Sequence, residues 1–235
     1  MYKDEYKRLC NCITSWDVLL DGIRYFYLYN YYPLTCDFSV TQEEWYIRKL
    51  IWDFKYKPDK TNIEAHKAAV LRIFLLLRDF LEVTFKNKTS ELTFVCIPAS
   101  TSLINEIRYK MFSEMLCGCL QMTNAFSKVQ IIRDKVEKRL GGTKLNIENL
   151  AFDDKFFKNR NILLFDDVVT SGDSMRKFDI KMKELGANVV GGISIGKTKH
   201  ERVVDNPIEL FQNRNINSSP CGINILKKLL DMGAI

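Results

Sequence analysis

The chain has 235 residues, which suits one large domain or one domain with a smaller appended part, and 46% of its residues are hydrophobic, enough for a sizeable core. Thirty-five Lys and Arg against 29 Asp and Glu give a net charge of +6. This mildly basic balance favours an anionic small-molecule partner and permits contact with nucleic acid without requiring it.

The first forty residues are rich in aromatic side chains, most densely in the stretch Arg24–Pro33. We expect strands or extended segments here that form a hydrophobic cap on the core. An alternative is that the rings form a stacking wall for a base or another planar ligand. Residues 1–90 are therefore predicted to be an aromatic-rich N-terminal cap with its helices.

Two helices are predicted next, each from a capping box. Thr41-x-x-Glu44 begins a helix that continues to about Tyr56, and Thr61-x-x-Glu64 begins a longer helix that ends near Phe85. His66 lies in the first turns of the second helix. The only other histidine, His200, is far away in the sequence, so no histidine pair has ligand spacing and neither receives a role.

Residues 91–97 have the composition of a buried strand, and the small polar loop Pro98–Ser102 follows. A helix should come next, with an apolar stripe formed by Leu103, Ile107, Met111 and Met115. This is the first strand–helix unit of a predicted α/β core. Residues 127–132 are the next strand candidate, followed by a polar connection, residues 133–144, that should lie between two strands of the core.

The most informative stretch is Asn161–Arg176, which reads NILLFDDVVTSGDSMR. An apolar run ends in Asp166 and Asp167, a short polar loop follows, and an apolar pattern of helical spacing then continues to Leu185, with Gly186 at the position of a C′ glycine. The sequence therefore predicts a buried strand, an acidic strand end, a tight loop and a helix. Backbone N–H groups of such a loop and of the helix N-terminus attract a phosphate, and the adjacent carboxylates can bind hydroxyl groups or a hard cation.

This stretch resembles the phosphoribosyl-pyrophosphate (PRPP) signature of the type I phosphoribosyltransferases. In that family the two acids hold the ribose hydroxyls and the loop wraps the 5′-phosphate. The resemblance implies the first role for Asp166 and Asp167, as catalytic and PRPP-binding residues. It implies the second role for Thr170, Ser171, Gly172, Asp173 and Ser174.

The resemblance implies further parts of a site. The loop after the first core strand contacts pyrophosphate in the family, which here is Ala99, Ser100, Thr101 and Ser102. A flexible basic lid would include Lys138 and Arg139, beside the Gly141-Gly142 pair. A helix that carries an arginine, here Arg108, points to the ComF-like branch. Mg²⁺ would be held mainly by PRPP, with Asp167 as a further candidate ligand.

A second phosphate-binding pattern must be weighed against this one. Gly191–Thr198 matches G-x-x-x-x-G-K-[ST] of the P-loop nucleotidases letter for letter. The intervening Ile193-Ser194-Ile195 has the composition of a strand interior, and the match follows the acidic strand where the usual order is the reverse. We therefore predict a strand at this position.

Cysteine spacing and hydropathy argue against two further classes. None of the seven cysteines forms a C-x-x-C pair, which gives no support to a zinc site. The most apolar stretch, residues 68–81, is interrupted by Arg72 and Arg78 and is too short to span a bilayer, and the N-terminus lacks the apolar core of a signal peptide. We expect a cytoplasmic protein with reduced thiols and no membrane partner.

The predicted fold is α/β, a type I phosphoribosyltransferase-like parallel sheet flanked by helices, with a cap (hood) from both terminal segments. Residues 91–199 would be the PRPP-binding core, and residues 200–235 would complete core or cap. The predicted function is transfer of phosphoribosyl from PRPP to a nitrogen nucleophile, with Mg²⁺ as the cofactor. A homodimer is a further expectation. Alternatives are a non-catalytic PRPP sensor, favoured by the Asp173 carboxylate in the phosphate loop, and a ComF-like nucleic-acid-associated protein that uses residues 52–60 and the basic lid.

Overall fold

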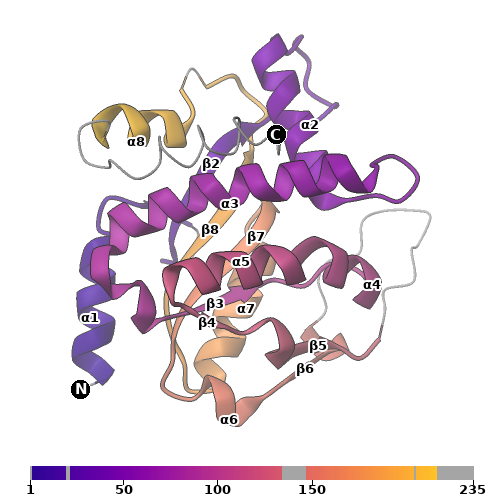
Figure 1. Cartoon of the computed structure of the whole chain (residues 1–235). Helices are drawn as coiled ribbons and strands as arrows, with labels where there is room; N and C mark the ends of the chain where they lie inside the picture. Colours follow the sequence, from indigo (N-terminus) through magenta and orange to yellow (C-terminus); the bar gives the residue numbers. More distant parts are fainter. Residues whose placement is uncertain (1, 20–21, 134–146, 204, 216–235) are drawn as a thin grey trace.

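In the computed structural model, which describes residues 2–19, 22–133, 147–203 and 205–215, the chain forms an α/β structure around a six-stranded, mostly parallel sheet (Figure 1). The strand order is β1-β2-β8-β7-β3-β4, and only the edge pair β1–β2 is antiparallel. The strands of this sheet are β1 (Asp17–Val18), β2 (Arg24–Tyr31), β3 (Leu92–Cys96), β4 (Thr123–Asn124), β7 (Asn161–Val169) and β8 (Asn188–Thr198).

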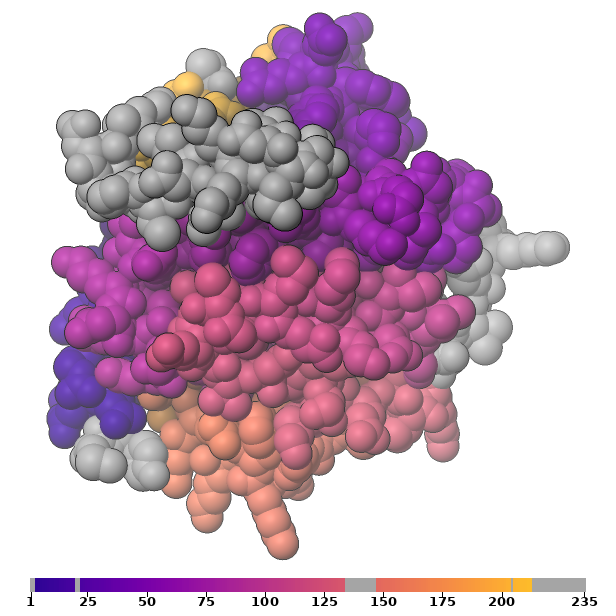
Figure 2. Space-filling view, viewed as in Figure 1, coloured from indigo at the N-terminus to yellow at the C-terminus, as the bar shows by residue number. Residues whose placement is uncertain are grey.

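Helices cover both faces of the sheet and divide the core in two. One face packs against α1 (Tyr2–Cys12), α2 (Gln42–Lys55), α3 (Ile63–Phe85), α5 (Met111–Leu120) and α8 (Pro207–Asn215). In Figure 1, α3 and α5 cross in front of the strands, and in Figure 2 their atoms form a band across the middle of the molecule. The other face packs against α7 (Asp173–Glu184) and the hairpin of β5 (Val129–Ile131) and β6 (Leu150–Phe152), with the short α6 (Asp154–Phe157) beside it.

The aromatic segment lies in the sheet and not in a cap. β2 pairs with β8 in parallel, and its alternate residues enter opposite cores: Tyr25 and Tyr27 on the α7 side, Phe26 and Leu28 on the α3 side. This corrects the expectation for Arg24–Pro33, because aromatic residues pack well on both faces of a buried strand. The predicted division of the chain at residues 90 and 199 remains a prediction.

The predicted helix starts are confirmed for α2 and shifted for α3. Thr41 accepts from Glu44 N, and the Glu44 carboxylate accepts from Thr41 N, so the capping box is formed. In α3 the cap is Asn62, one residue after the predicted Thr61, because the Asn62 amide oxygen accepts from Ala65 N at 2.7 Å.

The helix after β3 differs from the prediction. It is broken into α4 (Ser102–Asn105), a π-helical turn (Glu106–Lys110) and α5. The wider turn shifts the register, so the predicted stripe is wrong: Leu103 is 65% exposed and Met111 is 38% exposed. The buried side chains that replace this stripe are Tyr109, Phe112, Leu116 and Leu120.

The strand predicted at residues 127–132 is present as β5, but its predicted place in the core sheet is wrong. It pairs with β6 outside the main sheet, and β4 lies beside β3. The predicted lid residues Lys138 and Arg139 lie outside the described residues, as does all of the chain after α8. Among the helices that the structure describes, none combines the length and the apolar composition needed to cross a bilayer.

Candidate functional site

The predicted phosphate loop and the predicted pyrophosphate loop lie at the same edge of the sheet. β7 and β3 are parallel neighbours, with Cys96 opposite Phe165 and Ile97 N donating to Phe165 O at 2.8 Å. β3 ends at Cys96, so residues 98–102 leave the sheet where β7 reaches its two acids. β7 continues to Val169, and residues 170–174 leave the same edge of the sheet further along. The carboxyl edge of a parallel α/β sheet is the usual position of a ligand site.

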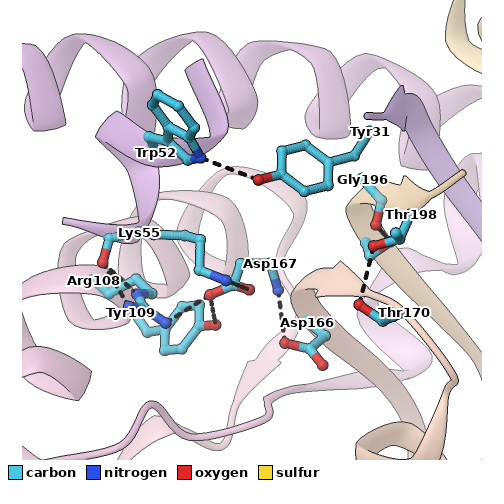
Figure 3. Close-up of polar contacts among 11 residues, drawn as sticks. Tyr31, Trp52, Lys55, Arg108, Tyr109, Asp166, Asp167, Thr170, Gly196 and Thr198 are labelled. Carbon is cyan, nitrogen blue, oxygen red and sulfur yellow. Dashed lines mark hydrogen bonds and ion pairs between the residues drawn. The ribbon is translucent and has the colours of Figure 1, made fainter. Parts of the chain in front are cut away.

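Asp167 is the centre of this edge and is fully engaged (Figure 3). Its Oδ1 lies 3.0 Å from Lys55 Nζ, and its Oδ2 accepts from Arg108 Nη1 at 2.6 Å and from the Tyr109 hydroxyl at 3.3 Å. Only 4% of the residue is exposed. A carboxylate that two cations already neutralise is poorly suited to bind Mg²⁺ or both hydroxyls of a ribose.

Asp166 is the open member of the pair. It is partly exposed, and its Oδ1 accepts from Asp167 N at 2.8 Å. Within the described residues, no donor is bound to its Oδ2. Alternate residues of a strand point to opposite faces, so Asp166 lies on the side of α7. Lys55 and Arg108 form their ion pairs with Asp167.

The two environments separate the pKa values of the adjacent acids. Burial and the negative charge of Asp167 raise the pKa of Asp166 to about 8, although Lys55 acts in the opposite direction. Burial also tends to raise the pKa of Asp167, but the charges of Lys55 and Arg108 outweigh it and hold that pKa below its usual range. Asp167 is therefore a fixed anion, and Asp166 is the acid whose charge can change near neutral pH.

Lys55 was not predicted as a site residue. It lies in the last turn of α2, where the local sequence Lys55-Tyr56-Lys57 places an aromatic residue between two cations. It reaches the site because α2 packs against β2 and β7, a contact that no local pattern indicates. The Asp167 charge raises the pKa of Lys55 despite burial, so Lys55 is a cation across the neutral range.

Arg108, predicted from the resemblance, does reach the site. Its Nε and Nη2 donate to Lys55 O at 2.8 and 2.5 Å, while Nη1 donates to Asp167. The π-helical turn brings Arg108 and Tyr109 to the same carboxylate. One guanidinium thus links the end of α2, the turn after β3 and the end of β7.

The loop after β7 has the shape expected of an anion-binding turn. Gly172 has φ of 90°, which only glycine adopts without strain, and it is the N-cap of α7 with no side-chain cap. Thr170 is fixed from β8: its carbonyl accepts from Lys197 Nζ at 2.7 Å, and its hydroxyl lies 3.0 Å from the Thr198 hydroxyl. The loop therefore offers the N-terminus of α7 and Lys197 to an anion.

The loop after β3 is partly used by its own helix. Thr101 caps α4 by accepting from Ile104 N, and Ala99 N donates to the Asn105 amide oxygen at 3.0 Å. Ser100 is exposed. These bonds give the predicted pyrophosphate loop a defined shape.

The P-loop pattern is a strand, as predicted. Gly191–Thr198 lies within β8, between β2 and β7. Gly192 is needed for packing, because a Cβ atom there would lie 2.2 Å from the Met175 Sδ. Lys197 donates to a carbonyl of the loop after β7 and is part of a strand, not of a P-loop.

An aromatic pair lies at the same edge. Trp52 Nε1 of α2 donates to the Tyr31 hydroxyl at 3.1 Å, and both side chains are partly exposed above Asp167 (Figure 3). Tyr31 ends β2, the aromatic strand for which a stacking wall was the alternative interpretation. The structure thus places two rings beside the acidic site.

Metal ligands are sparse at the site. Among the residues that the structure describes, no three His, Cys, Asp or Glu side chains gather to hold a metal ion. Asp166 is the side chain with an unused carboxylate oxygen, so a cation here would depend on oxygens of a ligand and on water.

Comparison with known proteins adds no family assignment. No protein-family model matches the chain, and no curated protein matches it.

Proposed function

We propose that the protein is a PRPP-binding enzyme of the type I phosphoribosyltransferase kind, which transfers phosphoribosyl to a nitrogen nucleophile and releases pyrophosphate. The observation that carries this is that the acidic pair of β7, the Gly172 loop and the loop after β3 all lie at the carboxyl edge of one parallel sheet. A 5′-phosphate would bind residues 170–174 and the N-terminus of α7. The pyrophosphate would face residues 99–102.

The two acids would have different tasks. Asp166 would accept from a ribose hydroxyl through its unused Oδ2, whereas Asp167 would hold Lys55 and Arg108 at the floor of the site. The reaction develops positive charge on the ribose ring and negative charge on the leaving pyrophosphate, so positioned charges supply most of the catalysis. Tyr31 and Trp52 would support a planar acceptor.

Mg²⁺, when bound with PRPP, would neutralise the pyrophosphate charge. Asp166 is the protein group that fits it, because Asp167 is already paired with two cations. The ligand oxygens and water would complete the coordination.

A second candidate, a non-catalytic PRPP sensor, is favoured by the closed state of Asp167. With both oxygens of Asp167 engaged, Asp166 alone is open to the two hydroxyls. PRPP would then act as a ligand that changes the exposure of the edge to a partner. Release of pyrophosphate from PRPP in the presence of nucleobases and small amines separates the enzyme from the sensor.

The shared test of both candidates is binding. PRPP with Mg²⁺ at about 100 times its Kd should raise the free energy of unfolding by about 2.7 kcal/mol, measured by thermal melting and calorimetry. Ribose 5-phosphate serves as the matched ligand without pyrophosphate. No heat and no melting shift at millimolar PRPP would reject PRPP binding.

A further inference from the structure

His66 lies beneath the site and touches two backbone carbonyls. It is 2% exposed, with Nδ1 at 3.0 Å from Asp53 O and Nε2 at 3.0 Å from Ile107 O. A carbonyl oxygen can only accept, so a ring nitrogen that carries a proton donates to the carbonyl that it faces. The ring spans the space between the two carbonyls, as a brace between two segments.

The two carbonyls belong to the segments that carry the cations of the site. Asp53 lies in the last turn of α2, two residues before Lys55, and Ile107 immediately precedes Arg108 in the π-helical turn. Carbonyls at the end of an α-helix need partners beyond the regular helical ladder. Asp53 O accepts from Tyr56 N at 3.3 Å and also faces His66 Nδ1. Arg108 binds Lys55 O, so two side chains contact carbonyls at the end of α2.

The surroundings of the ring leave it this bracing role. Phe54 and Tyr56 lie against it, with ring centroids at 6.4 and 5.3 Å. Two acids on the helices that carry these groups are paired with lysines: Asp53 with Lys49 at 2.5 Å, and Glu64 with Lys67 at 2.9 Å. No contact joins His66 to Asp167, so an effect on the site must pass through the two backbone segments.

We propose that His66 is a positioning residue, which holds the ends of α2 and of the π-helical turn so that Lys55 and Arg108 close on Asp167. We call the contact of Lys55 and Arg108 with Asp167 the clamp. Its role in ligand binding rests on the proposed function. The clamp itself does not, because Lys55 and Arg108 contact Asp167 through their own side chains.

The experiment measures the clamp directly, as the solvent exchange of the Arg108 Nε proton by NMR in the full-length protein. H66F keeps an aromatic ring but removes both ring nitrogens, and it should speed this exchange at least tenfold. H66Q keeps one N–H donor and should give an intermediate rate. The only other histidine, exposed in the structure, provides the control H200Q, which should leave the rate unchanged.

Global opening is monitored by the backbone amide of Leu164, which is buried in β7. An Arg108 rate that is unchanged in folded H66F, or that rises only in step with the Leu164 amide, would overturn the proposal. If H66F does not fold, H66Q and H66N, which each keep one N–H donor, take its place with the same criteria.

PRPP affinity is measured on the same variants. The proposal expects at least fivefold weaker binding in H66F and partial recovery in H66Q. Equal affinities together with faster Arg108 exchange would show that the clamp does not serve the ligand. Failure of the wild-type protein to bind PRPP would reject the proposed function, while the exchange result still decides whether His66 holds the clamp.

Discussion

At the residue scale, the two adjacent acids should respond to substitution in opposite ways. The pKa of Asp166 is about 8 in the folded protein, above the ordinary value of an aspartate. Between about pH 4 and 8 the folded state therefore binds the proton more tightly than the unfolded state, and stability falls as the pH rises. Asp166→Asn removes this loss, so the variant should be more stable than the wild type at pH 9, by about 2–4 kcal/mol, with the difference shrinking towards pH 4.

Urea unfolding across this pH range measures the difference, and the exposed Asp37 provides the control variant D37N. At pH 9, where Asp166 is ionised, the same D166N protein should bind PRPP about tenfold more weakly, because a charge-assisted hydrogen bond is lost. A D166N protein that is destabilised at pH 9 and binds PRPP normally would contradict the site as described.

Asp167→Asn should destabilise the protein. A carboxylate that ends a strand beside an open cleft would tolerate this change. Asp167 differs, because Lys55 and Arg108 would be left without a counter-charge. A loss of about 3 kcal/mol is expected at pH 7 from denaturant unfolding.

The pKa of Asp167 is lowered on folding, so its stabilising effect exists above the ordinary pKa of an aspartate and disappears as the pH falls through the folded value. The difference between D167N and the wild type should therefore vanish in acid. A constant difference at all pH values would show that lost packing, and not the ion pair, is responsible.

At the element scale, β8 is an internal strand in which Gly192 allows α7 to pack closely. Gly192→Ala would place a Cβ 2.2 Å from the buried Met175 Sδ, so it should cost about 1–3 kcal/mol in chemical unfolding. Met175→Ala in the same chain should recover part of this cost. Gly118→Ala in α5 meets nothing within 4 Å and, as a helix-interior control, should stabilise by about 0.5–1 kcal/mol.

The same element gives a functional control. Because Lys197 donates to Thr170 O from the end of a strand, Lys197→Ala should leave ATP and GTP hydrolysis indistinguishable from the wild type. A nucleotide hydrolysis activity that this variant abolishes would favour the P-loop interpretation.

At the scale of the whole molecule, β2 joins the N-terminal part of the chain to the sheet. It lies between β1 and β8, and α2 and α3 cover one face of the core. A fragment of residues 91–215 would expose the edge of β8 and lose α2 and α3, which cover one face of the sheet, so it should show no cooperative thermal unfolding by circular dichroism. A cooperative transition in this fragment would restore the idea of a separable cap.

Local patterns in the sequence determined the strand, acidic pair, glycine loop and helix from Asn161 to Leu185, including the C′ position of Gly186, whose φ is 76°. They did so because side-chain period, turn chemistry and capping are properties of a few consecutive residues. The same reasoning identified Gly191–Thr198 as a strand.

Tertiary structure alone decided which charges meet. Arg108 is separated by 53 residues from Lys55 and by 59 from Asp167. The spacing of apolar residues did not indicate the π-helical turn that brings Arg108 and Tyr109 to that carboxylate. The place of β2 inside the sheet was equally hidden, because an aromatic strand and an aromatic cap have the same composition. Pairing and desolvation between distant segments made Asp167 a closed anion and Asp166 an open acid, although the two residues are neighbours of the same type.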